Sequence, residues 1–247
     1  MMKQKTTNNT TMIQKLISRK ETNLNLIIYC SFILIAIVGI FYGNAIKSTF
    51  SFLRIWDFQN ILILLVGIPF LILQSNVNLP DFLQVGISNK QRFLEPIVIG
   101  ALFGILDIIV VKLVLHPEPY TELPPFLQPF PYSIFLYFSG AFEIEVFYRL
   151  IPLVIILLLG KWIASGKYFN IFLWTALILT SLREPLEQLP DGELWFIAYS
   201  VLTGFLMNYF QAIYFKNAGF LASLTLRLGH YLFWHILLGV YVQYFEL

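Results

Sequence analysis

The sequence predicts an all-α protein, a polytopic transmembrane helical bundle of about seven helices with a polar cavity formed by the later helices. Three observations lead to this prediction. The composition is 58% hydrophobic and only 12% charged, which lies far outside the range of soluble domains. Apolar runs of about 20 residues, the length that spans a bilayer as a helix, recur along the chain. Charged residues inside those runs are concentrated in the later ones, and this pattern indicates a shared polar interior.

The chain begins with a polar, basic segment that precedes its first apolar run. We predict residues 1–22 to be a cytoplasmic amino-terminal tail and residues 23–247 to form a single transmembrane helical domain. No small-residue cleavage site closes the first run, so we expect a retained anchor and not a signal peptide. Cys30 in this run is the only cysteine. A single cysteine excludes CxxC metal sites and disulfides within the chain, and we expect its side chain to be buried.

Seven apolar runs follow one another, and the second of them is rather short. They cover residues 24–42, 58–74, 96–115, 132–159, 169–189, 194–215 and 220–243. Residues 43–58, between the first two, look amphipathic and are predicted to lie at the membrane interface. Residues 116–131 contain six prolines. Because proline breaks a helix, this segment is predicted to be an irregular connection.

Lysine and arginine are distributed unequally between the two sets of connections. The tail and the connections near residues 75–95, 160–168 and 216–219 carry most of them, whereas residues 116–131 carry none. The positive-inside rule therefore places the amino terminus in the cytoplasm and the carboxyl terminus outside. The net charge of +2, with no basic stripe, excludes a nucleic-acid partner. The partner that the composition does predict is the lipid bilayer.

The fourth run contains the stretch FEIEVFYRLIPL, which places three charged residues inside the membrane. Each costs a few kcal/mol at the centre of a helix, so we expect them to face a polar cavity or one another. Glu145 and Arg149 are four residues apart on one helix face and can pair. Glu143 lies about 200° around a regular helix from Glu145. It therefore needs its own polar neighbour or a local bulge in the helix.

The fifth run ends in SLREPLEQLP, which carries Glu184, Glu187 and Gln188. Two interpretations of the glutamates stay open. They pair with Arg183 in a solvated outer cap, or a helix tilt or a break at Pro185 brings them to the other buried charges.

The seventh run carries the last group of polar residues. Arg227, His230 and Trp234 share one helix face, and His230 reaches the same depth as the glutamates of the fourth run at about 1.5 Å per residue. His235 lies about 140° away and is predicted to be a packing histidine. Asp107 of the third run is the expected partner of an arginine.

Three of these stretches resemble the motifs of one known family. EIEVFYR is similar to the EExxxR motif of the CPBP family, which includes the type II CAAX prenyl endopeptidases and the bacteriocin-processing Abi proteins. SLREPLEQLP stands where that family has FxxxH followed by Leu-Pro, and NAGFLASLTLRLGHYLFWH stands where it has its last histidine helix. The resemblance covers residues 132–243, which would be the family-like core.

The resemblance implies an intramembrane endopeptidase that hydrolyses a peptide bond of a membrane protein or peptide with glutamate-activated water. Glu143 or Glu145 would activate the water, Arg149 would orient the carboxylates, and His230 would bind the oxyanion with Gln188 or Glu184. The supporting residues in this interpretation are Glu184, Glu187, Gln188, Arg227 and His235. No metal ligand set is predicted and no cofactor is expected, although a divalent metal is left open. We expect a multi-pass protein of the plasma membrane of a prokaryote.

The sequence departs from each of the three motifs. Counted back from Arg149, Ile144 occupies the place of the first, catalytic glutamate. Gln188 stands where the second motif has histidine, and Trp234 stands where the third has asparagine. Two hypotheses follow: a CPBP-like endopeptidase that is active or catalytically impaired, or a non-enzymatic membrane binder or transporter whose buried charges hold a polar ligand or a proton. A peptidase needs a glutamate and His230 in one pocket, whereas a binder needs only paired charges.

Overall fold

The computed structural model describes residues 2–50 and 52–247, with side chains from residue 22 onward. This part of the chain is helical and contains no strand. The α-helices are α1 (Met2–Ile46), α2 (Phe58–Leu73), α3 (Glu95–Asp107), α4 (Tyr132–Glu145), α5 (Ile151–Trp162), α6 (Phe169–Glu187), α7 (Leu194–Ala218), α8 (Phe220–Tyr231) and α9 (Leu238–Tyr241). Shorter helical turns extend or join them, and these are Gln74–Val77, Lys90–Leu94, Ile108–Leu115, Val146–Leu150, Ile163–Gly166, Leu232–Leu237 and Val242–Glu246. The prediction of an all-α protein is confirmed.

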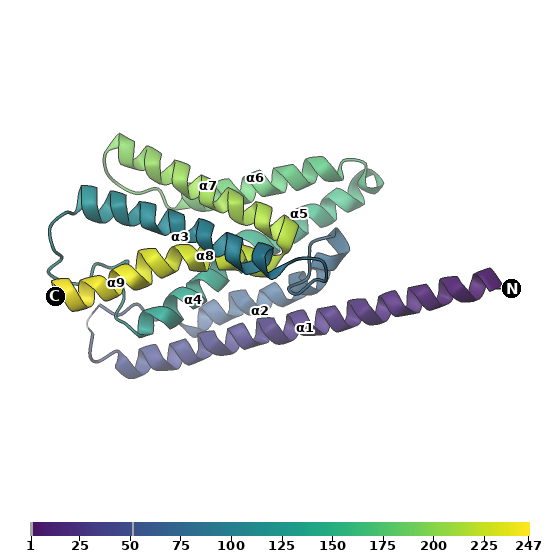
Figure 1. The fold of residues 1–247 in the computed structure, drawn as a ribbon, viewed down its shortest axis with the longest axis horizontal. Coiled ribbons are helices and arrows are strands. Elements are labelled where there is room, and N and C mark those ends of the chain that lie inside the picture. Colours follow the sequence, from purple (N-terminus) through teal and green to yellow (C-terminus); the bar gives the residue numbers. More distant parts are fainter. Residues whose placement is uncertain (1, 51) are drawn as a thin grey trace.

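Once the joining turns are included, the described residues form seven continuous helical runs at the positions of the seven predicted runs. Figure 1 shows them side by side along the long axis, with the two chain ends at opposite ends of the molecule. Four runs are long and apolar enough to cross a membrane: Thr22–Ile46, Phe58–Val77, Lys90–Leu115 and Leu194–Ala218. The other three, built on α4–α5, α6 and α8–α9, carry the buried Glu145, Arg149, Glu184 and Arg227.

The outer surface of the bundle is apolar. Leu34, Leu62 and Leu102 are each more than 60% exposed, which is the arrangement of side chains that face lipid. Cys30 lies on this exposed surface of α1, so the prediction that it is buried was wrong. The physical reason is that α1 packs through one side only, against α2 and α4, and a small apolar thiol on its other side contacts lipid at no cost.

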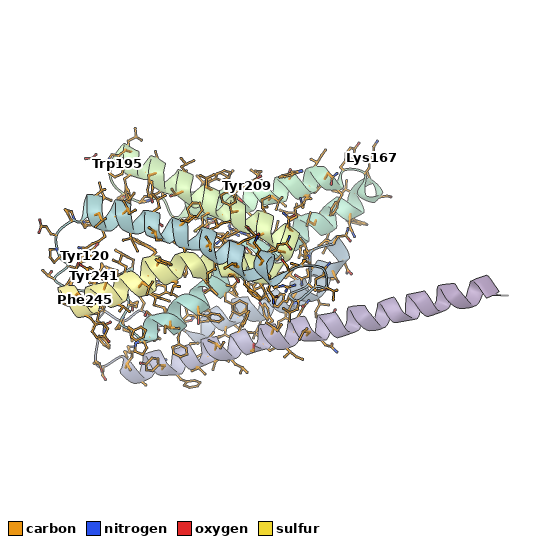
Figure 2. The ribbon with its side chains drawn as sticks, viewed as in Figure 1. Tyr120, Lys167, Trp195, Tyr209, Tyr241 and Phe245 are labelled. Atoms are coloured by element: carbon orange, nitrogen blue, oxygen red, sulfur yellow. The ribbon has the colours of Figure 1, made fainter. Side chains whose placement is uncertain are left out.

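Exposed aromatic residues lie near both ends of the bundle, and Trp162 and Tyr168 lie close to Lys167 in the sequence. In Figure 2, Trp195 and the trio of Tyr120, Tyr241 and Phe245 lie at the end where the chain terminates, whereas Lys167 lies at the opposite end. Tryptophan and tyrosine at helix ends match the interfaces of a bilayer, where an amphipathic ring contacts both lipid and water.

Helices α3 and α8 pack closely, and this contact positions the polar interior. A methyl group added at Gly100 would lie 1.9 Å from the carbonyl oxygen of Leu226, and one added at Gly229 would lie 2.4 Å from the carbonyl oxygen of Ile97. Only glycine allows two backbones to approach this closely, as in the small-residue contacts of membrane helices. The middle of α3 therefore lies directly against α8, and the last turn of α3, with Gly104, lies against the end of α8 at His230.

The structure describes both connections singled out in the sequence. Residues 116–131 are irregular, as predicted. Residues 43–58 form no helix of their own, because α1 continues to Ile46 and the described residues from there to Asp57 form turns and irregular chain. Two hydrogen bonds hold this chain: the backbone N–H of Arg54 donates to Gln128, and the hydroxyl of Tyr132 donates to the carbonyl oxygen of Arg54.

Candidate functional site

A buried arginine on α8 organises the polar interior. The guanidinium of Arg227 donates to both carboxylate oxygens of Glu184 on α6, at 2.8 and 2.5 Å. Both side chains are more than nine-tenths buried. A planar guanidinium matches a carboxylate with two parallel hydrogen bonds, and this geometry offsets part of the cost of removing both charges from water. The sequence interpretation that brings Glu184 to the other buried charges is the one that the structure shows, and α6 continues through Pro185 to reach them.

A second arginine, Arg149, lies beside the first and is completely buried. It sits in the π-helical turn Val146–Leu150 and donates to the carbonyl oxygen of Thr180, 3.0 Å away. It also donates to the side-chain oxygens of Asn208 and Gln211 on α7. Arg227 donates to the same two oxygens, at 3.1 and 2.9 Å. Two neutral amide groups thus hold two cations side by side.

Glu145 is the third charged member of this interior, and it is fully buried. It accepts a hydrogen bond of 2.6 Å from Ser223, and its other oxygen lies 3.7 Å from Nε of Arg227. Glu145 and Arg149 form no ion pair within 4 Å among the described residues, because Arg149 uses its terminal nitrogens on the neutral oxygens of α6 and α7. Arg227 is therefore the ion-pair partner of two carboxylates.

Asp107 and His230 form a separate pair at the contact between α3 and α8. Nε2 of His230 lies 2.7 Å from one oxygen of Asp107, and the hydroxyl of Tyr199 on α7 donates to the other oxygen at 2.6 Å. The expectation that Asp107 pairs with an arginine was wrong. The glycine contact of α3 with α8 brings the end of α3 opposite His230, which lies about one helical turn beyond Arg227.

A cavity of about 300 Å³ lies between these helices. Five of the predicted site residues line it: Glu184, Gln188, Arg227, His230 and His235. Asp107, Tyr199, Ser200, Thr203 and Asn208 add further polar side chains to its wall. Glu145 and Arg149 do not line the cavity but lie behind Arg227 and Asn208, to which they are linked.

Glu143 lies away from the cavity, on the side of α4 that faces α2. Its carboxylate accepts hydrogen bonds from the indole nitrogen of Trp56 at 3.0 Å and from the amide of Asn60 at 3.0 and 3.1 Å. The prediction that Glu143 needs its own polar neighbour is confirmed. The structure does not bring Glu143 together with His230, because Glu143 lies on the side of α4 opposite to Glu145 and the polar interior.

Glu187 also lies outside the cavity. It pairs with Arg183 at 2.8 Å and accepts a 2.5 Å hydrogen bond from Tyr148, with both charged side chains partly exposed. The interpretation of a solvated outer cap therefore holds for Glu187 and fails for Glu184. The two residues are three apart in a helix, yet one ends in the interior and the other on the surface.

His235 has the packing role that the sequence predicted and also borders the cavity. Its Nδ1 lies 2.8 Å from the carbonyl oxygen of Phe126, and its ring stacks on Tyr137 with 4.2 Å between centroids. Since a carbonyl oxygen can only accept, Nδ1 carries the hydrogen in this contact. His235 therefore ties the irregular connection 116–131 to the wall of the cavity.

Sequence reasoning missed the residues that connect the charges. Tyr199, Asn208, Gln211 and Ser223 were not singled out, although two amide side chains inside an apolar run are a signal that could have found them. The stretch GALFG, which contains Gly100 and Gly104, was a second available signal for close helix packing.

No group of three or more His, Cys, Asp or Glu side chains that could hold a metal ion occurs among residues 22–50 and 52–247. The cavity instead offers carboxylates, an imidazole and a guanidinium that are bonded to one another. Such a wall can hold a polar ligand.

Comparisons with known proteins return no match: no family model, no curated protein and no solved structure matches the chain.

Proposed function

We propose that this chain is a multi-pass membrane protein whose later helices enclose a polar chamber, and that the chamber binds or transports a small polar ligand. One observation carries the proposal. Both glutamates of EIEVFYR lie outside the wall of the cavity, whereas the carboxylates in the wall are already bonded to Arg227 and His230. A binder needs paired charges around a cavity, and this is the arrangement present.

The membrane part of the proposal extends from four helices to seven. The three charged runs, built on α4–α5, α6 and α8–α9, lie among the apolar ones in the bundle. Because their charges are paired in the interior, their outer surfaces are free to face lipid. We propose that all seven runs cross the plasma membrane, with the amino terminus in the cytoplasm.

The similarity of three stretches to CPBP motifs raises the question of whether one of their glutamates could activate water. Water activation by glutamate requires a carboxylate oxygen that faces the water and is free to accept its proton. Both carboxylate oxygens of Glu184 already accept hydrogen bonds from Arg227, so neither is free to take a proton from water. Glu145 is enclosed between Ser223 and Arg227. We therefore propose a relative of these endopeptidases that has lost their catalytic arrangement.

Intramembrane peptide hydrolysis is the second candidate function, and one contact favours it. Asp107 orients His230 at the cavity wall, and a carboxylate bonded to an imidazole is a recurrent acid–base arrangement in hydrolases. In that case His230 would be the base in place of a glutamate.

A cavity-filling variant tests the binding function. Thr203 lines the cavity on α7, and Thr203→Trp would occupy its volume. Leu202→Trp adds the same ring to the exposed side of the same helix, where Leu202 is 59% exposed, and serves as the control. Native mass spectrometry of the detergent-purified proteins should show a retained small molecule in the wild type and in the control, and none in Thr203→Trp.

A pool of fluorescence-quenched transmembrane peptides tests the competing function. We expect no cleavage by the wild type. Cleavage that disappears in Glu143→Gln, in Glu145→Gln or in His230→Gln would name the base and replace the binding function with peptide hydrolysis.

A further inference from the structure

We propose that the ligand of this chamber is an organic ammonium ion, carried either by the head group of an amine-bearing lipid or by a small free amine. This inference rests on the proposed binding function and adds the chemical class of the ligand. Charge, wall composition and an unpartnered nitrogen each point to a cation with N–H or N-methyl groups.

The charges in the wall of the cavity leave a deficit of one positive charge. Asp107 and Glu184 contribute two carboxylates, and Arg227 contributes one guanidinium. Behind the wall, the opposite charges of Glu145 and Arg149 sum to zero. Counted over the carboxylates and guanidinium groups alone, the chamber therefore carries one negative charge, which is costly in a low-dielectric interior unless a cation balances it.

Aromatic rings form much of the remaining wall. Five of them line the cavity: Phe103, Phe196, Tyr199, Tyr231 and Trp234. The faces of such rings attract cations, and cages of aromatic rings are the usual recognition surface for quaternary ammonium groups. The guanidinium of Arg227 already lies 5.8 Å from the ring centre of Tyr231. Aromatic rings combined with an excess of carboxylates over guanidinium groups favour an organic cation over a hydrated metal ion.

His230 adds an acceptor to this wall. Its Nε2 donates to Asp107 when the ring is neutral, which leaves a lone pair on Nδ1. That nitrogen is buried and has no hydrogen-bond partner, and the residue is only 6% exposed. An ammonium N–H that reached this buried nitrogen would supply the donor that it lacks. The cavity volume of about 300 Å³ lies at the small end of ligand pockets, which suits a head group and not a large solute.

The first experiment compares a cation with its uncharged isostere. The wild-type protein is placed in phosphatidylglycerol nanodiscs and titrated with choline, with ethanolamine and with 3,3-dimethyl-1-butanol, the neutral carbon analogue of choline. Binding is followed by tryptophan fluorescence, since Trp234 lies in the wall. We expect at least one of the two amines to bind about tenfold more tightly than the neutral analogue, the size of a desolvated cation–π contact.

A conservative variant then tests whether the net negative charge of the cavity wall contributes to amine binding. Asp107→Asn keeps the shape of the side chain and removes its negative charge, and it should weaken amine binding by about tenfold. Asp191→Asn removes the same charge from an exposed connection and should leave the affinity unchanged.

The source of the ammonium group is decided by the lipid. If a lipid head group is the ligand, nanodiscs with phosphatidylethanolamine should lower the apparent affinity for added choline or ethanolamine, and native mass spectrometry should show one retained phosphatidylethanolamine. If a free amine is the ligand, the affinity should be the same in both nanodiscs.

Three results would overturn the inference: no binding of either amine, equal binding of the neutral analogue, or equal losses in Asp107→Asn and Asp191→Asn. A retained neutral or anionic molecule alongside any of these would leave the proposed binding function intact. Absence of any retained molecule together with peptide cleavage would remove both.

Discussion

At the scale of single residues, Arg227 holds the polar interior together. It pairs with Glu184 through two hydrogen bonds, lies within ion-pair distance of Glu145, and shares two amide oxygens with Arg149. Taking one partner out of a buried ion pair leaves the other as an uncompensated charge, which costs far more than the pair itself contributes. The interior therefore depends on this side chain more than on any one carboxylate.

We predict that Arg227→Met lowers the free energy of unfolding by about 3–5 kcal/mol, because two buried carboxylates lose their cation. Glu184→Met should lower the free energy of unfolding by less, because Arg227 keeps its contacts with Glu145 and with the two amide oxygens. The double variant should be less destabilised than the sum of the single ones by about 1–3 kcal/mol, which is the coupling of contacting residues. Chemical unfolding in detergent micelles measures all three.

The matched control lies on the same helix as Glu184. Arg183 and Glu187 form an arginine–glutamate pair of 2.8 Å at the surface, 36% and 46% exposed. The corresponding methionine variants should change stability by no more than about 1 kcal/mol, as exposed pairs do. If the surface and the interior variants lost the same free energy of unfolding, Arg227 would contribute no more to stability than an exposed ion pair does.

Residue types could be predicted from the sequence, but their partners could not. A charged residue inside an apolar run is predicted to be buried. This prediction is confirmed for Glu145, Arg149, Glu184 and Arg227. Which carboxylate meets which arginine depends on the rotation of each helix about its axis, and a rotation of 100° moves a side chain to the next residue's direction. Glu143, on the opposite side of α4 from the interior, shows how large that effect is.

At the scale of helices, the contact between α3 and α8 sets the position of the cavity. Gly100 and Gly229 bring the two backbones together, and Asp107 reaches His230 as a consequence. Hydropathy predicts where helices begin and end, because lipid and core both require apolar side chains. It says nothing about which two helices touch, and small residues at regular spacing carry that information.

We predict that Gly100→Ala separates these helices. The added methyl group would lie 1.9 Å from the carbonyl oxygen of Leu226, so one backbone must move. A loss of about 1–3 kcal/mol in unfolding free energy follows, as for other overpacked sites, together with weaker ligand binding.

Gly140→Ala is the control for that substitution. It lies in α4 with no atom within 4 Å of the added methyl group. Alanine at an open helical position should stabilise the protein by about 0.5–1 kcal/mol. The same unfolding measurement applies, and a Gly100→Ala protein as stable as Gly140→Ala would contradict the close packing of α3 on α8.

At the scale of the whole molecule, the seven helical runs and the irregular connections agree with the pattern of apolar runs and prolines in the sequence. Hydropathy does not establish that the three charged runs cross the membrane, because charged residues lower the mean hydropathy by which a span is recognised. For the run built on α4–α5, the crossing depends on whether Glu143, Glu145 and Arg149 are satisfied within the protein. Each of them has polar partners from other helices or connections, so we predict that this run spans the bilayer.

Labelling of single cysteines tests that prediction in intact cells. In a Cys30→Ser background, Glu122→Cys and Lys167→Cys place one thiol in each of the two connections that flank the α4–α5 run, at exposed positions. A membrane-impermeant maleimide should label Glu122→Cys in intact cells and Lys167→Cys only after permeabilisation, since the positive-inside rule puts Lys167 in the cytoplasm. Labelling with the sides exchanged would invert the orientation. Labelling of both in intact cells would mean that the run between them does not cross, and the chamber would then have to open at the membrane surface.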